Sequence, residues 1–227
     1  MARYGRAELV VATVGLLSLA VALVVSVPWM AILPLAALAF FFYFFRDPER
    51  RVPEAPGLVV APADGVITDV SACEGGPFVG SRALRIGIFL SVFDVHVNRS
   101  PVSGRVAYLD YRKGRFHNAM RFDACSRENE CSCVGLQTEA LPGGRVLIRQ
   151  IAGALAQRIV TACRLGDSLA RGERFGMIKF GSRTELLISE PDWLEVRVKV
   201  GDHVKGGETV LASVREAPCA APSGPVA

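Results

Sequence analysis

The sequence predicts a mainly β protein, with a β-sandwich or barrel-sandwich-like domain that follows an N-terminal apolar helical hairpin. Residues 9–45 contain no charged side chain. From Arg46 onward, short runs of β-branched and apolar residues are interrupted every eight to twelve residues by Gly, Pro or Asp, which is the pattern of an all-β domain. We therefore expect three parts: a membrane-associated helical segment at 1–46, a β domain at 47–215 and a flexible tail at 216–227.

The uncharged stretch is too long for one straight helix across a bilayer. At about 1.5 Å per residue it would reach about 55 Å, whereas the hydrocarbon core is about 30 Å thick. Pro28 and Pro34 lie near its middle, where the missing N–H donor and the ring favour a break. Two shorter helices, 9–27 and 31–45, are therefore expected to form a hairpin that dips into or crosses the membrane.

Basic residues flank this hairpin on both sides: Arg3, Arg6, Arg46, Arg50 and Arg51. Because cytoplasmic flanks carry an excess of Lys and Arg, both ends of the hairpin and the β domain are expected at the cytoplasmic face of the cell membrane. The aromatic block 40–45 then predicts an interfacial belt. A cleaved secretory signal would suit Ala20-Val21-Ala22, but the apolar run continues far beyond that point.

Seven segments of the β domain have strand character, and one short segment, 153–159, could be helical. The predicted strands are 65–70, 84–90, 104–111, 145–151, 157–162, 185–188 and 194–200.

Parts of the β domain repeat. Gly166–Glu173 and Gly201–Glu208 share the pattern G-D-x-apolar-x-x-G-E at a separation of thirty-five positions, and Pro62–Ile67 resembles Pro101–Val106. Repeated strand-turn units indicate a pseudo-symmetric β domain, as in lipoyl and biotinyl modules.

Composition narrows the function classes. The net charge of +4 is modest, so no nucleic-acid partner is expected, and a mildly basic surface suits anionic lipid headgroups.

Of six cysteines, Cys125, Cys131 and Cys133 cluster, but without the paired C-x2-4-C spacing of structural zinc sites. We therefore expect no metal, and a polar loop with reduced, incidental thiols. Redox sensitivity or metal capture is the alternative.

A Gly-Ser pair, Gly181-Ser182, stands between two apolar strand-like runs. In a strained turn, a serine hydroxyl can attack the preceding glycine carbonyl and give an ester. β-Elimination then breaks the chain and leaves a group that hydrolyses to pyruvoyl, an electrophilic ketone suited to covalent catalysis. Alone the pair is weak evidence, because Gly-Ser is also a common turn dipeptide.

Two further motifs accompany FGSR at 180–183: PADG at Pro62–Gly65 and SVFDVHVNRSPVSG at Ser91–Gly104. In this order and spacing, over about residues 45–213, the chain resembles phosphatidylserine decarboxylases of the short bacterial and archaeal type. The resemblance implies a lyase of phospholipid biosynthesis that converts membrane phosphatidylserine to phosphatidylethanolamine through a Schiff base. The pyruvoyl group, derived from Ser182, would be its covalent cofactor.

The resemblance also implies a proenzyme. Cleavage between Gly181 and Ser182 would give a larger and a smaller fragment, held together by strand pairing, and a homo-oligomer is compatible with this interpretation. Decarboxylation needs a place for the electrons that the departing carboxylate leaves, and the pyruvoyl group supplies one.

His96 is the candidate base, because among the three histidines it alone follows an apolar strand on a motif of the resemblance. His117 and His203 are the less favoured candidates. Asp64 of PADG would orient His96 as the acid of a triad does, or it is a turn aspartate bonded to its own backbone. Arg99 stands where the longer bacterial members carry a second histidine, and its planar fork would suit a substrate phosphate or carboxylate.

Two other functions compete with this interpretation. A membrane-tethered lipoyl- or biotinyl-like module, or an efflux-adaptor-like protein, would explain the repeats, and Met177-Ile178-Lys179 faintly resembles a biotin-accepting turn. A pyruvoyl-dependent decarboxylase of a soluble amino acid would not require a membrane hairpin. Denaturing electrophoresis separates enzyme from module, because only the enzyme yields two fragments.

Overall fold

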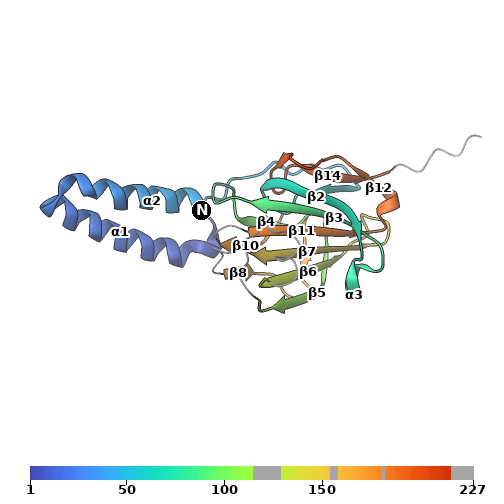
Figure 1. The fold of residues 1–227 in the computed structure, drawn as a ribbon. Helices are drawn as coiled ribbons and strands as arrows, with labels where there is room; N and C mark the ends of the chain where they lie inside the picture. Colours follow the sequence, from blue (N-terminus) through green and yellow to red (C-terminus); the bar gives the residue numbers. More distant parts are fainter. Residues whose placement is uncertain (115–128, 154–157, 180–181, 216–227) are drawn as a thin grey trace, which may run out of the picture.

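The computed structural model describes residues 1–114, 129–153, 158–179 and 182–215 (Figure 1). Gly181, His117, Cys125, the predicted tail 216–227 and most of the helix candidate 153–159 lie outside these residues.

The N-terminal hairpin has the predicted form. A short 3-10 turn, η1 (Arg3–Gly5), leads into α1 (Arg6–Ser26), a second 3-10 turn, η2 (Pro28–Ala31), and α2 (Ile32–Phe44). Pro28 begins η2, where a missing N–H costs nothing, and Pro34 lies in the first turn of α2 for the same reason.

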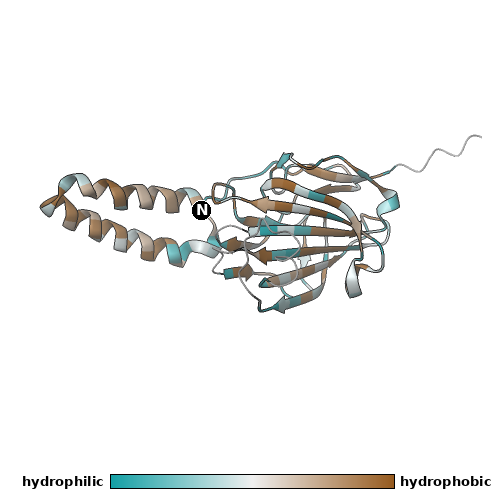
Figure 2. Cartoon of the chain, viewed as in Figure 1, coloured by the Kyte–Doolittle hydropathy of each residue, from teal (hydrophilic) through white to brown (hydrophobic). Residues whose placement is uncertain are grey.

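The two helices lie antiparallel and project together away from the β domain (Figure 1). Their surfaces are apolar on nearly all sides (Figure 2), and Val25, for example, is 86% exposed. A helix that is apolar all round and uncovered is typical of a membrane segment. Among the described helices one, spanning Arg3–Ser26, is long and apolar enough to cross a bilayer, and α2 is shorter.

The described residues of the β domain form three antiparallel sheets, and the largest curls into a half-barrel (Figure 1). Its strands run in the order β13-β2-β3-β11-β7-β6-β5-β9, and the small sheets are β1-β14-β12 and β4-β10-β8. The strands are β1 (Leu58–Val60), β2 (Gly65–Cys73), β3 (Ala83–Leu90), β4 (Val97–Arg99), β5 (Gly104–Arg112), β6 (Cys131–Gln137), β7 (Arg145–Ala152), β8 (Arg158–Thr161), β9 (Ser168–Leu169), β10 (Arg174–Lys179), β11 (Ser182–Ser189), β12 (Leu194–Val196), β13 (His203–Val204) and β14 (Val210–Val214). The described residues also include a short helix, α3 (Gly76–Val79), and a 3-10 turn, η3 (Pro191–Trp193). The mainly β prediction is confirmed.

Strand β11 lies in the middle of the large sheet. Ser182 pairs with Leu90 of β3 on one side and with Ala152 of β7 on the other, and every residue of β11 is buried. Aliphatic side chains of the neighbouring strands fill the core beneath it, among them Ile67, Ile86, Ile88, Leu136 and Ile148. The segment that begins at Ser182 is therefore held from both sides as far as Ile188.

Two local predictions are wrong. Cys131 and Cys133 lie in strand β6, not in a polar loop, because β5 and β7 pair with this segment on both sides. The strand predicted at 194–200 ends at Val196, because the chain turns there toward Gly201, whose φ of 96° suits glycine.

Candidate active site

Two of the predicted catalytic residues carry polar atoms that are buried and unpaired. Within the described ranges, the Ser182 hydroxyl and Nε2 of His96 have no hydrogen-bond partner, and both side chains are completely buried. Leaving a buried polar group unpaired costs about 1–3 kcal/mol, so such exceptions call for a functional explanation. A hydroxyl that must become a nucleophile and a nitrogen that must accept its proton would provide one.

His96 is held in a defined tautomer. Its Nδ1 lies 2.9 Å from the backbone carbonyl oxygen of Asp94, which can only accept, so Nδ1 carries the proton and Nε2 keeps its lone pair. The imidazole packs against the ring of Phe44, with 4.4 Å between centroids. Burial, with a smaller contribution from Arg46, lowers the pKa of His96 to about 4 against the opposing effects of Asp94, so the imidazole is neutral at physiological pH.

The strands around His96 also lead to Ser182. The carbonyl of His96 accepts a 3.2 Å hydrogen bond from the N–H of Ile178, four residues before Ser182 in the chain. Asn98, two residues after His96, donates a 3.3 Å hydrogen bond to Thr184, two residues after Ser182. The site therefore lies where β4 and β10 approach the start of β11.

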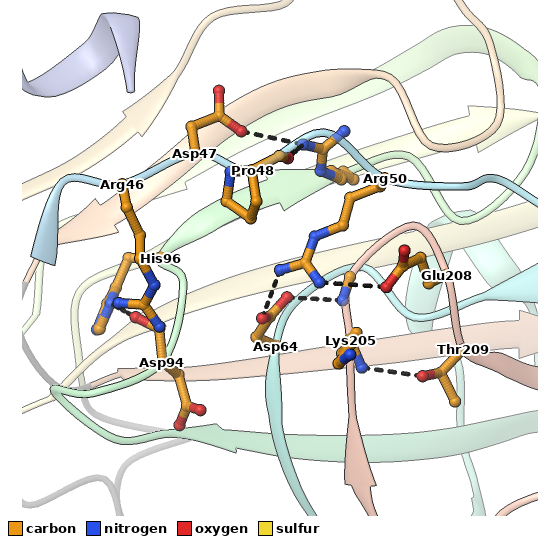
Figure 3. Close-up of polar contacts among 12 residues, drawn as sticks. Arg46, Asp47, Pro48, Arg50, Asp64, Asp94, His96, Lys205, Glu208 and Thr209 are labelled. Atoms are coloured by element: carbon orange, nitrogen blue, oxygen red, sulfur yellow. Dashed lines mark hydrogen bonds and ion pairs between the residues drawn. The ribbon is translucent and has the colours of Figure 1, made fainter. Parts of the chain in front are cut away.

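Asp64 lies in a separate charged cluster, shown beside the His96 group in Figure 3. One carboxylate oxygen accepts a 2.7 Å bond from Arg50, and the other accepts a 2.8 Å bond from the N–H of Gly206. Arg50 also pairs with Glu208 at 3.3 Å. Burial raises the pKa of Asp64, against the opposing effects of Gly206 and Arg50. No hydrogen bond joins Asp64 to His96 among the described residues, so its role as the orienting acid stays a prediction.

Steric crowding explains why a glycine follows Asp64 in PADG. Gly65 has a φ of 144°, and a Cβ at this position would lie 2.1 Å from the carbonyl oxygen of Phe89 on β3. Only glycine allows β2 to approach β3 this closely directly after Asp64. The motif therefore fixes the backbone that presents the Asp64 carboxylate.

Asp94 is the main residue that sequence reasoning missed. Its carbonyl holds His96, and its carboxylate accepts hydrogen bonds of 2.8 and 2.7 Å from the N–H and hydroxyl of Ser91. The same carboxylate lies 3.2 Å from Nε2 of His203. The spacing S-x-x-D from Ser91 to Asp94, a capping-type turn, was the available signal. The sequence contains no comparable signal for Arg50, the partner of Asp64.

Arg99 is buried and already bonded to protein. Its guanidinium donates to the carbonyl of Gly172 at 3.1 Å, to the carboxylate of Asp47 at 3.0 Å and to the carbonyl of Pro48 at 3.0 Å. The bonds to Asp47 and Pro48 fasten the segment that follows the hairpin to β4. A contact between Arg99 and the substrate therefore stays a prediction.

The base of the hairpin packs directly against the site. Phe44 and Phe45 share a buried apolar cluster with Val95, Val97 and Met177. Val95 and Val97 flank His96 in the sequence. Val97 belongs to β4 and Met177 to β10. A 3.2 Å hydrogen bond from the hydroxyl of Tyr43 to the carbonyl of Phe93 and an ion pair between Lys179 and Glu8 reinforce this contact. The membrane-type helices and the candidate catalytic groups therefore form one continuous structure.

A metal centre is not evident in the part of the chain that the structure describes. No three His, Cys, Asp or Glu side chains gather there in a ligand arrangement. That no metal takes part in the reaction stays a prediction.

Comparison with known proteins gives one answer over most of the chain. Residues 37–212 match the family model for phosphatidylserine decarboxylase. The chain is 49% identical over 199 residues to a phosphatidylserine decarboxylase proenzyme of Symbiobacterium thermophilum, covering 87% of this chain and 90% of that protein. Identity to the proenzyme of Rhodopirellula baltica is 45% over 216 residues, with 94% and 88% covered.

The proenzyme of Oleidesulfovibrio alaskensis gives 44% identity over 208 residues, with 90% of this chain and 92% of that protein covered. These matches favour an enzyme over the lipoyl-like or adaptor module. The chain belongs to the phosphatidylserine decarboxylase family and is a pyruvoyl-dependent carboxy-lyase made as a proenzyme that is cut into two chains.

Proposed function

We propose that this chain decarboxylates phosphatidylserine to phosphatidylethanolamine at a pyruvoyl group formed from Ser182, after it has cut itself between Gly181 and Ser182. The observation that carries the assignment of residues is the pair of buried, unpartnered atoms: the hydroxyl of Ser182 and Nε2 of His96. Their burial removes competing water, and the fixed tautomer of His96 leaves a lone pair ready to accept a proton.

Self-cleavage needs only groups of the chain and one water. Nε2 of His96 takes the hydroxyl proton while the oxygen of Ser182 attacks the carbonyl of Gly181. The peptide C–N bond between Gly181 and Ser182 then breaks, and the nitrogen of Ser182 receives the proton. This leaves an ester and a free amine. Removal of the Cα proton of Ser182 expels the carboxylate of Gly181 and forms dehydroalanine. Its imine tautomer is hydrolysed by water, which releases ammonia and leaves the pyruvoyl group.

The surroundings of Ser182 fit such a group. Pairing with Leu90 and Ala152 keeps the start of β11 inside the sheet once the chain is cut, so a new N-terminus would stay in place. The bound pyruvoyl group supplies an electron sink for the pair that the departing carboxylate leaves. Neutral His96 can accept a proton at Nε2 from the ammonium group of the substrate as the Schiff base forms, and can return it to the substrate carbon after the carboxylate has left.

The hairpin supports a lipid substrate and a cytoplasmic site. Phe44 contacts His96, so the apolar helices bring the reacting groups to the membrane surface, where a serine headgroup lies. Arg3 and Arg6 lie at the start of the hairpin and Arg46 follows it, and the positive-inside bias therefore supports a cytoplasmic location for both ends and for the β domain.

Intact mass of two serine variants tests the assignment. Ser182→Ala lacks the attacking oxygen and should remain one inactive chain of 24.4 kDa. Ser189→Ala is the matched control: it is a buried serine at the other end of β11, and its hydroxyl already donates to the carbonyl of Arg145. That variant should yield two chains like the unmutated protein. Two fragments from Ser182→Ala would refute the proposal.

A further inference from the structure

Two thiols of strand β6 lie beside each other. Cys131 and Cys133 are two residues apart, so their side chains leave the same face of the sheet, and their sulfur atoms are 3.7 Å apart. Both are free thiols. This separation is that of a sulfur–sulfur hydrogen bond, so a single proton can be shared between the two atoms. Neither thiol belongs to the candidate active site.

The neighbouring strand places a positive charge next to the pair. Arg149 of β7 stands directly opposite Cys133, and Ile151 stands opposite Cys131. The pKa of Cys131 is lowered to about 7, first by the hydrogen bond from Cys133 and then by Arg149, although burial opposes both. The pKa of Cys133 is raised, chiefly because its proton is the shared one. At neutral pH the pair therefore holds a large fraction of thiolate.

Solvent reaches the pair from one side. Cys131 is buried, but Cys133 is partly exposed and lines a cavity of about 220 Å³ together with Phe78, Tyr108 and Arg149. A small reagent that enters the cavity meets the sulfur of Cys133, with the sulfur of Cys131 directly behind it.

We propose that Cys131 and Cys133 are a redox-active dithiol that a small-molecule disulfide oxidises reversibly. Cys133, the sulfur that solvent reaches, passes its proton to the thiolate of Cys131 and then attacks one sulfur of the reagent, whose other sulfur leaves as a thiolate. Cys131 loses its proton and attacks the sulfur of Cys133, and the second half of the reagent leaves. Two protein thiols and one disulfide thus become one protein disulfide and two small thiols, which carry away both protons.

The strand geometry makes this disulfide easy to reduce. Two residues of an extended strand separate Cα atoms by about 6.7 Å, which is at the upper end of the range for disulfides. Bonds at such limits are more oxidising and more labile than structural disulfides. A reversible switch is therefore expected here, and a permanent crosslink is not.

Other cysteines of the described ranges provide contrast. Cys73 and Cys163 have no sulfur partner, and burial raises the pKa of both thiols, to about 11 for Cys163. They should react much more slowly with the same reagent. This difference makes them internal controls within one protein.

The test treats the full-length protein with a series of oxidised and reduced glutathione mixtures, quenches it with an alkylating agent and digests it with trypsin. Cleavage after Arg127 and Arg145 isolates peptide 128–145, which contains Cys131 and Cys133 and no other cysteine. In oxidising mixtures this peptide should lose the mass of two hydrogens and take up no alkyl group. Excess reduced glutathione should restore two alkylation sites.

Variants identify the resolving sulfur. Cys131→Ser should leave Cys133 as a stable mixed disulfide with glutathione, and Cys163→Ser should leave the internal disulfide unchanged. The proposal is overturned if peptide 128–145 of the unmutated protein keeps two alkylatable thiols in every mixture, or if Cys73 reacts as fast. Protection of both thiols that a chelator reverses and reduced glutathione does not would overturn it equally, because it would indicate a bound metal. None of these outcomes depends on cleavage at Ser182.

Discussion

Two units of the β domain share one backbone design and differ in the side chains that it presents. The Asp64 unit combines residues 62–67 with 201–208, and the Ser103 unit combines 101–106 with 166–173. In each, a two-residue strand of the second segment pairs with the glycine of the first: Val204 with Gly65, and Leu169 with Gly104. The following hydrogen bonds are also equivalent, each between 2.8 and 2.9 Å: Gly201 to Ile67, Ile67 to Asp202, Gly166 to Val106 and Val106 to Asp167.

The equivalence extends to one side chain and then stops. The hydroxyl of Ser103 accepts a 3.0 Å bond from the N–H of Arg171, as Asp64 does from the N–H of Gly206. This acceptor belongs to the architecture of the unit. The second oxygen of Asp64, bonded to Arg50, has no counterpart on a serine. The hydrogen bond from the backbone N–H is therefore structural in both units. The negative charge of Asp64 is present in one unit only, and it is the feature available for function.

The largest effect should come from giving the Asp64 unit the side chain of the other unit. Asp64→Ser can keep the bond from Gly206, but it removes the carboxylate from Arg50. We expect a loss of at least about 100-fold in self-cleavage rate, in the range typical of acid–base groups. Arg50 keeps Glu208 as a partner, so the variant should still fold, with a lowered unfolding temperature. Densitometry of the two fragments over time measures cleavage.

The reciprocal variant is the control for this exchange. Ser103→Asp adds a carboxylate at an exposed position of the Ser103 unit and should mature at the normal rate. If Asp64→Ser matured within threefold of the unmutated rate, the Asp64 charge would be as structural as the hydroxyl of Ser103.

The repeated units and the hairpin could be predicted because their signals are local. Glycine, proline and aspartate mark turns through their own backbone preferences, so G-D-x-x-x-x-G-E and Pro28 were informative by themselves. Strand β6 was not predictable, because Glu130, Ser132 and the cysteines favour a loop and only pairing with β5 and β7 overrides that preference. The tautomer of His96 was equally hidden, since a backbone carbonyl holds it and leaves no mark in the sequence.

Acid should destabilise the folded chain through His96. His96 has a folded pKa of about 4 against an ordinary value of 6.5. Below pH 6.5 the unfolded chain therefore binds a proton at His96, whereas the folded chain does not bind it until about pH 4. The free energy of unfolding should fall by roughly 3 kcal/mol between these values. Urea unfolding of the uncut Ser182→Ala chain at pH 7 and pH 4.5 measures the change.

Adding His96→Gln to this background should remove that part of the pH dependence, because glutamine does not titrate. An equally steep loss of stability in the double variant would mean that other groups cause the acid sensitivity. The imidazole of His96 would then be more accessible to protons than its burial indicates.

The smallest effect should come from exchanging the histidine of the Asp64 unit for the equivalent serine of the other unit. His203 occupies the position of Ser168, and its ring lies 3.2 Å from the carboxylate of Asp94. The side chain of His203 is 60% exposed, and such exposed pairs contribute about 0.2–1 kcal/mol. Ser91 bonds the other carboxylate oxygen of Asp94, so the turn that holds His96 should survive. We expect His203→Ser to mature normally and to turn over phosphatidylserine within threefold of the unmutated rate. A loss beyond tenfold in turnover with normal maturation would instead place His203 in the decarboxylation step, and the Asp64 unit would then contribute a second proton carrier beside His96.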